Sequence, residues 1–339
     1  MSTESPPSQT RRFFRSWWVR YLLLSVVFVV VAYFVNDWRW QRKWASYETD
    51  ARARGVKIYL PEYDRSGEVP DAENFAATPL WKEVFAKDGK GPRATRLVKA
   101  SQTAGTQPAK SKPGSRPPRK NLAVWRAGFA LNKESTKSDA SVTDAEAVLR
   151  GLEFVQPELD ELRDGLKRPQ CVFPQNYTSI AEMRYSHFSV LQAAAKLFSL
   201  RSLARLSNGD GTGALDDIRT MFELAGKLES EPTLIAGLVE TSMVSMARQA
   251  ISDGMDTGRW ADDQLREIEA LISRVNLIQR HVFSIESERA FVNSMLAKYI
   301  VDGTRHKDVP PGTPTEFNWL VEPPIWMSSR MTVCPNGVQ

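Results

Sequence analysis

The sequence predicts an all-α protein with one N-terminal transmembrane helix followed by a bundle of helical hairpins. Three observations lead to this fold class. A long apolar run lies near the N-terminus, apolar residues recur every three or four positions from residue 143 to residue 301, and no alternating strand pattern follows residue 60. Spacing of three to four residues is typical of amphipathic helices, whereas half-buried strands alternate at every second residue.

The transmembrane helix is predicted over residues 21–35, an apolar run interrupted only by Ser25. Crossing a bilayer takes about 20 mostly apolar residues, and flanking aromatic residues extend the run to that length. No small-x-small cleavage site follows it, and it has no polar face. The sequence therefore predicts an uncleaved signal anchor rather than a secretory leader or a buried core helix. The expected membrane-interface residues are Trp17, Trp18, Arg20, Trp38 and Trp40.

Basic residues predict how the anchor is oriented. Four of them lie within fifteen positions before the apolar run and three lie within fifteen positions after it. Because cytoplasmic flanks carry the excess of positive charge, we expect residues 1–20 to form a cytoplasmic tail. The C-terminal domain is then expected on the exocytoplasmic side of the cytoplasmic (inner) membrane of a bacterial envelope.

Two connecting segments are predicted between the anchor and the bundle. Residues 36–86 are expected to form a juxtamembrane helix that stops at Gly55, a short extended stretch, and a short helix with Thr78 at its N-cap. Residues 87–142 are expected to form a basic flexible linker. Within it, residues 87–120 hold ten lysines and arginines against one aspartate. Such a composition buries too little apolar surface to offset the entropy cost of ordering.

The basic loop at 87–120 is also a candidate contact for an anionic lipid or polymer, since lysine and arginine clusters bind anionic surfaces. It has no aromatic residue on which a base could stack. The expected exocytoplasmic location further argues against nucleic acid. The default interpretation is nevertheless a solvated linker that binds nothing.

The helical domain is predicted over residues 143–301, and the Pro-rich residues 302–339 are expected to be irregular. It begins with a capping box, in which Thr143 precedes Glu146 by three residues. Residues 231–251 are apolar almost all round, so we expect them to form the central helix. Three amphipathic stripes are predicted: Ile180, Met183, His187, Leu191, Ala194 and Phe198; Leu215, Ile218, Met221, Ala225 and Leu228; and Leu265, Ile268, Ile272 and Val275.

The stretch LARLSNGDGTGALDDIRTMF, residues 203–222, predicts a helical hairpin similar to that of a tetratricopeptide repeat. Ser202 and Arg205 stand where that repeat has a small residue and an aromatic one, and no second copy follows 34 residues later. The prediction is therefore a single repeat-like hairpin and not an array. The positions that match the repeat are Gly209, Asp210, Ala214 and Leu215.

The whole pattern resembles an uncharacterised family of membrane-anchored helical proteins from planctomycetes and verrucomicrobia. The resemblance covers residues 36–86 and 155–295, and it is carried by VPDAENFA, the hairpin with the helix after it, WADDQLREIEALI and IESERAF. It implies a membrane-anchored helical domain. It implies no activity.

Few residues are candidates for chemistry. His281 and Glu288 share one face of a predicted helix with Ile285, Val292, Met295 and Tyr299. A carboxylate on an apolar face has a raised pKa unless it is paired, which is one route to a general acid or base. The alternative is a structural ion pair of Glu288 or Glu286 with an arginine such as Arg289. His187 lies on an apolar stripe and is expected to be a hydrogen-bonded core histidine.

No metal or cofactor site is predicted. The sequence has no zinc, nucleotide-binding or serine-hydrolase motif, and its two cysteines, Cys171 and Cys334, are far apart.

The leading functional hypothesis is a membrane-tethered binding or scaffolding module that presents a surface to a protein partner, rather than an enzyme. One alternative is a hydrolase-type enzyme that acts on envelope material through Glu288 and His281. Another is a subunit of a membrane complex that packs through the helix at 36–54.

Overall fold

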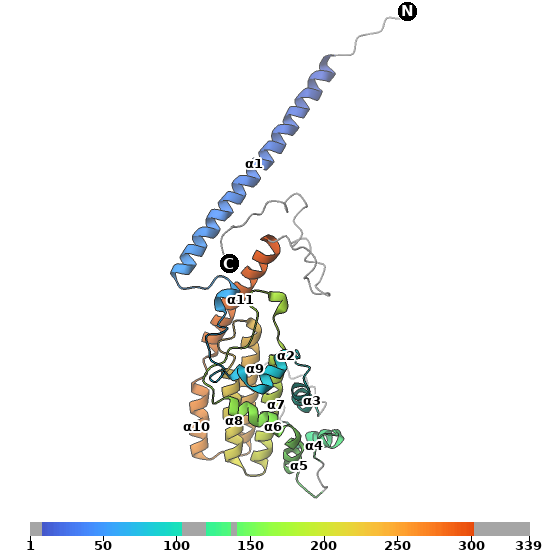
Figure 1. Ribbon diagram of the computed structural model, residues 1–339, viewed down its shortest axis with the longest axis vertical. Helices are drawn as coiled ribbons and strands as arrows, with labels where there is room; N and C mark the ends of the chain where they lie inside the picture. The colour runs from blue at the N-terminus through green and yellow to red at the C-terminus, as the bar shows by residue number, and fades with distance from the viewer. Residues whose placement is uncertain (1–8, 104–119, 137–140, 302–339) are drawn as a thin grey trace, which may run out of the picture. The chain divides into compact units, whose positions relative to one another are not determined.

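The computed structural model describes residues 9–103, 120–136 and 141–301, and this part of the chain is helical (Figure 1). Within it no strand forms, and one isolated bridge joins Asn74 to Gln170. The chain divides into two compact units, one with the N-terminal helix and one with residues Tyr59–Leu296. The predicted all-α class is confirmed, as are the apolar N-terminal helix and the helical bundle that follows it.

The first unit is built on α1, Gln9–Ala53, a single continuous helix (Figure 1). Among the described helices α1 alone is long and apolar enough to cross a membrane; its apolar window has a mean hydropathy of 2.2 and none of it is buried. The core helix of a soluble protein would be mostly buried, and this window is not. As predicted, the helix stops at Gly55, whose φ of +73° is a conformation that favours glycine.

The aromatic residues at the C-terminal flank of the apolar window are paired with cations on α1 itself. The Arg42 guanidinium lies 4.0 Å from the ring centroid of Trp38, and the Lys43 ammonium lies 5.2 Å from that of Trp40. Such contacts hold a charged group beside an amphipathic ring, the arrangement that suits a membrane–water interface.

The second unit is centred on α7, Ser186–Ser207, in which 16 of 22 residues are buried. The prediction that residues 231–251 form the central helix is therefore wrong. The helix in that region is α9, Leu234–Asp256, and it exposes Ile235 and Leu238. Helix α7 packs against α3 (Pro92–Gln102), α5 (Asp144–Gly151), α8 (Gly211–Gly226) and α9, while α10 (Asp262–Ser273) packs on α8 (Figure 1).

The helical stripe predicted from Ile180 begins too early. Ile180 lies in a short 3-10 turn, Ile180–Glu182, and α7 starts only at Ser186. The loop before α7 is held by Gln175, whose side chain donates to the Arg184 carbonyl and accepts from the Arg184 N–H at 3.0 Å. These hydrogen bonds satisfy backbone groups that a helix would otherwise pair.

The predicted hairpin at 203–222 forms from α7 and α8, with Gly209 in the turn at a φ of +83°. The two residues that depart from the tetratricopeptide pattern tie these helices together. Ser202 donates to the Ala214 carbonyl at 3.1 Å, and Arg205 donates to the Gly213 carbonyl at 2.9 Å. Membership of that repeat class stays a prediction.

The flexible linker predicted at 87–142 is wrong for its described residues, which include α3 and α4 (Leu122–Leu131). Ala94, Leu97 and Ala100 are fully buried. Two arginines of α3 find acidic partners on α6, Gln156–Gly165: Arg93 pairs with Glu161, and Arg96 donates to Glu158 at 2.9 Å. Packing and ion pairing therefore order a segment whose composition alone predicts disorder.

The segments before and after residues 87–142 can also be compared with their predicted boundaries. The juxtamembrane stretch after Ile58 belongs to the bundle, since the second unit begins at Tyr59. Its helix α2, Pro79–Ala86, follows Thr78 at the N-cap position as predicted, and Trp81 is fully buried in the core. Helix α5 begins as predicted, with the Thr143 hydroxyl accepting from the Glu146 N–H at 3.1 Å. The segments 1–8 and 302–339 lie outside the described residues.

The buried ammonium of Lys120 predicts that the free energy of unfolding depends on pH. Its ammonium donates to Ser199 of α7, and burial lowers its pKa to about 8, with Asp253 opposing the change and Lys196 adding to it. The unfolded chain keeps the ordinary value of 10.5, so between about pH 8 and 10.5 the unfolded state binds more protons than the folded state. The free energy of unfolding is therefore expected to rise with pH across this window, relative to Lys120→Met. Denaturant titrations of both chains measure the difference, and a difference that stays flat with pH would contradict the assignment.

Candidate functional site

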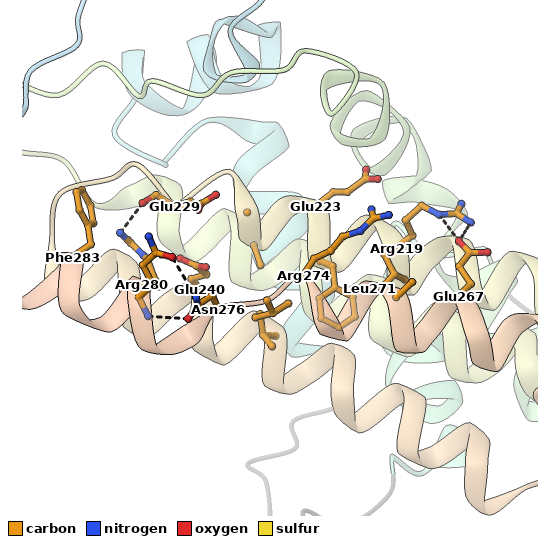
Figure 2. A pocket seen from close by; sticks show the side chains of 17 residues that line it. Arg219, Glu223, Glu229, Glu240, Glu267, Leu271, Arg274, Asn276, Arg280 and Phe283 are labelled. Atoms are coloured by element: carbon orange, nitrogen blue, oxygen red, sulfur yellow. Dashed lines mark hydrogen bonds and ion pairs between the residues drawn. The ribbon is translucent and has the colours of Figure 1, made fainter.

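A groove of about 600 Å³ lies where α8, α9, α10 and the start of α11 (Leu277–Val301) meet (Figure 2). This volume is in the range of ordinary ligand and peptide pockets. Apolar side chains from several elements form part of its lining: Phe222 and Ala225 from α8, Val244 from α9, Leu271 from α10, Val275 from the α10–α11 connection and Phe283 from α11.

Arg280 fixes one end of the groove (Figure 2). Its side chain is nearly buried, and its Nε lies 2.6 Å from an oxygen of Glu240 on α9. The guanidinium also donates to the carbonyl oxygens of Glu229, at 2.8 Å, and Glu231, at 3.1 Å. It thereby joins the first turn of α11 to α9 and to the α8–α9 connection. Desolvation raises the pKa of Glu240 and lowers that of Arg280, and their mutual attraction opposes both changes.

Arg219 on α8 organises the other end. It lies 2.5 Å from Asp216 on its own helix and donates through Nε to Glu267 of α10 at 3.0 Å. The hydrogen bond to Glu267 raises the pKa of Arg219. Both ends of the groove are thus tied by ion pairs between different helices, which keeps the apolar lining between them accessible.

Between these ties the groove carries charged groups for which no ion pair is found among the described residues. Glu223 and Glu229 are exposed at the α8 side, and Arg274 is exposed where α10 ends. Gly226 lies between the two glutamates in sequence and has open space around it, since a Cβ there would meet no atom within 4 Å. An apolar lining with charges of both signs suits a polypeptide segment.

The predicted catalytic pair does not contribute to this groove. Glu288 accepts from the Leu234 N–H at 3.3 Å, where it meets the positive N-terminal end of α9. His281 is exposed, and neither residue lines the groove. The face of α11 that they share with Ile285 and Val292 is not the buried face. The buried positions of that helix are Arg280, Ser284, Ser287 and Ala290.

His187 lies in the core as predicted, but it is not satisfied by hydrogen bonds. Its ring packs on Phe188 and Phe173, with centroids 4.0 Å and 4.4 Å away. Nε2 lies 3.6 Å from a Glu231 oxygen, and neither ring nitrogen has a hydrogen-bond partner within the described structure. The histidine is therefore held by aromatic packing and by the nearby carboxylate.

Two further groups of contact residues are predicted, the membrane-interface residues of α1 and the basic loop at 87–120. Trp17, Trp18, Arg20, Trp38 and Trp40 are all exposed on α1, as interface residues must be. In the basic loop Lys110, Lys112, Arg116 and Arg119 lie outside the described residues. Arg93 and Arg96 pair with acidic residues of α6 and Lys120 donates to Ser199. The other described lysines of the loop, Lys87, Lys90 and Lys99, are exposed, and contact with an anionic surface stays a prediction.

Comparison with family models, with curated proteins and with solved structures finds no match for this chain. The resemblance to the planctomycete and verrucomicrobial family stays a prediction. Within the described ranges no group of three or more histidine, cysteine or acidic side chains is placed to hold a metal ion. The groove and the apolar N-terminal helix are the two features from which a function can be argued.

Proposed function

We propose that this protein is a membrane-tethered binding module whose groove takes up a segment of a protein partner. The single observation that carries the proposal is the groove itself, with an apolar lining, unpaired charges and ends held by ion pairs between helices. The tether is supported by α1, whose apolar window is not buried by the rest of the chain. With the N-terminus in the cytoplasm, the groove faces the exocytoplasmic side, as in a scaffold of the bacterial envelope.

The lining suggests the chemistry of the partner segment. An apolar side chain would rest near Gly226 and Phe222, where space is open and the surface is apolar. Basic groups on the same segment would pair with Glu223 and Glu229, and an acidic group would pair with Arg274. Such charge pairs at the rim select the partner and its direction more than they add affinity.

The hydrolase alternative has no comparable support. It needs an imidazole and a carboxylate that face a substrate, within hydrogen-bond reach of a reacting group. Glu288 instead accepts the Leu234 N–H of α9, and His281 lies on the exposed side of its helix.

Filling the groove tests the proposal. Gly226→Phe places an aromatic ring in the open space, while Gly226→Ala adds only a methyl group where no atom is within 4 Å. A photoreactive amino acid at Arg274 then reports occupancy in intact membranes, with the same label at Arg266, an exposed α10 residue outside the groove lining, as the matched control. We expect a defined protein adduct from position 274 and not from 266. The Phe variant should reduce it at least about tenfold, because the ring takes the binding volume.

The Ala variant should retain the adduct, and circular dichroism should show unchanged helicity in both. Equal adducts from 274 and 266, or an adduct indifferent to Gly226→Phe, would show that the groove is not the binding site.

A further inference from the structure

Three exposed cations lie on one side of α1 just beyond its apolar run. Arg39, Arg42 and Lys43 are spaced by three and four residues, so they share one face of the helix. The side of α1 that is half-buried or buried is a different one, and it holds Asp37, Trp44, Glu48 and Ala51. The three cations therefore point away from the acidic groups of Asp37 and Glu48.

The arginines further along the chain are bound to it, whereas these three cations are not. Arg52 pairs with Glu48 at 3.0 Å, and Nε of Arg54 donates to the Asp50 carbonyl at 3.2 Å. No ion pair of Arg39, Arg42 or Lys43 is found among the described residues. Asp50, the acidic residue on the cationic side, lies about 10 Å along the helix axis from Lys43. The charge of the cluster is thus left for a partner outside the helix.

Tryptophan rings hold two of the cations in place. Arg42 lies over the ring of Trp38 and Lys43 over that of Trp40, and both rings are exposed. A ring face attracts a cation but offers no oxygen acceptor, so the N–H donors of both side chains remain available to an anion. Asp37, the nearest acidic residue, instead accepts from the Gln41 amide at 2.9 Å.

The position of the cluster along α1 is that of the lipid headgroups. Arg39 and Lys43 lie about 6 and 12 Å beyond Val35, the last residue of the predicted apolar run. The headgroup layer on each side of the hydrocarbon core is about 5–8 Å thick. Helical side chains lean toward the N-terminus of their helix, which here is back toward the bilayer. The charged ends of the cluster therefore fall in the headgroup layer.

We propose that Arg39, Arg42 and Lys43 form a binding site for the headgroup of an anionic phospholipid, an inference that rests on the membrane tether of the proposed function. A zwitterionic lipid carries its own ammonium group, which competes for the phosphate and repels the cluster. An anionic lipid leaves the charge of its phosphate to the protein, and guanidinium groups bind phosphate oxygens in pairs. With the N-terminus in the cytoplasm, this lipid belongs to the exocytoplasmic leaflet.

A photoreactive amino acid at Asn36 tests the site. Asn36 is exposed, lies three residues before Arg39 on the same face, and is at the edge of the apolar run. Phe34, at nearly the same depth on the opposite face, is the matched position. The full-length protein is reconstituted into vesicles of equal amounts of phosphatidylglycerol and phosphatidylcholine, and mass spectrometry identifies the lipid in each adduct. We expect position 36 to favour phosphatidylglycerol at least about fivefold. Position 34 should give both lipids about equally.

Two double variants separate the site from the overall charge of the helix. Arg39→Gln/Arg42→Gln should lower the preference at position 36 at least about threefold. Arg52→Gln/Arg54→Gln removes the same charge further along the chain and should leave it unchanged. Chloride at 1 M should weaken the preference in the native chain, because the Debye length falls from about 10 Å at 0.1 M salt to about 3 Å.

The outcomes also distinguish this inference from the tether. An equal yield of both lipids at position 36, or a preference that Arg39→Gln/Arg42→Gln leaves unchanged, would overturn the inference while the chain stays in the membrane. Inorganic phosphate that lowers the preference more than chloride of equal ionic strength would assign the cations to a soluble anion, which also overturns it. A chain that leaves the vesicles in alkaline carbonate would overturn the tether together with the lipid site.

Discussion

Replacing Asp217 with alanine is expected to lower the free energy of unfolding by about 3–5 kcal/mol, the cost of breaking a buried ion pair. The Asp217 side chain is fully buried on α8 and is bound by guanidinium groups from two other helices. Arg201 of α7 lies 2.6 Å away, Arg163 of α6 2.8 Å and Arg205 of α7 3.0 Å. Burial raises the pKa of Asp217, and the three guanidinium groups oppose this rise. Without the carboxylate the buried Arg201 guanidinium loses its acidic partner and faces the partly exposed guanidinium groups of Arg163 and Arg205.

The neighbouring residue supplies the control. Asp216 is partly exposed and pairs with Arg219 at the surface, so Asp216→Ala is expected to cost no more than about 1 kcal/mol. Urea titration of full-length chains in detergent measures both, and labelling of the buried thiol Cys171 in a Cys334→Ser background reports unfolding of the core. Equal effects at 216 and 217 would show that the network does not hold α6, α7 and α8 together.

Replacing Val27 and Val30 with arginine is expected to abolish stable membrane insertion. Each arginine at the centre of a spanning helix costs about 2.5–3.5 kcal/mol, and two of them outweigh much of what the apolar run contributes. The chain should then appear in the soluble fraction or be degraded. Ser46→Arg/Thr49→Arg makes the same change with the same spacing on α1, beyond the apolar run, and should leave the chain in the membrane. Membrane retention of the first variant would show that α1 is not the anchor.

The sequence predicts those parts of the fold that depend on neighbouring residues. The apolar run that became α1, the stop at Gly55 and the Thr143 cap are all local patterns, and the structure shows each of them. Local composition does not predict helix α3, because its order comes from distant partners. Glu158 and Glu161 lie more than 60 residues from the arginines that they bind, so local composition gives no sign of the pairing.

The groove could not be predicted from local patterns either, because its residues are distant in sequence. Arg280 is bound to carbonyls 49 and 51 residues away, and the groove takes its lining from four helices. On α11 the apolar periodicity is real, but the face that carries Ile285 and Val292 is exposed. Serines that hydrogen-bond to their own helix can be buried at little cost, and the larger residues are left outside. Hydrophobic spacing identifies the apolar face of a helix, but it does not show whether the core of the same chain buries that face.

A module of this kind depends on its tether, so the fate of the N-terminal helix in the native chain is the most direct test. The full-length protein is isolated from cells, extracted with alkaline carbonate, and its N-terminus is determined by mass spectrometry, while a reporter fused after Gln339 reports export. We predict a chain that keeps the residues before Asn36, stays with the membrane under carbonate, and carries an exported reporter. A chain that begins after Asn36, or that dissolves when cells are broken without detergent, would contradict the account.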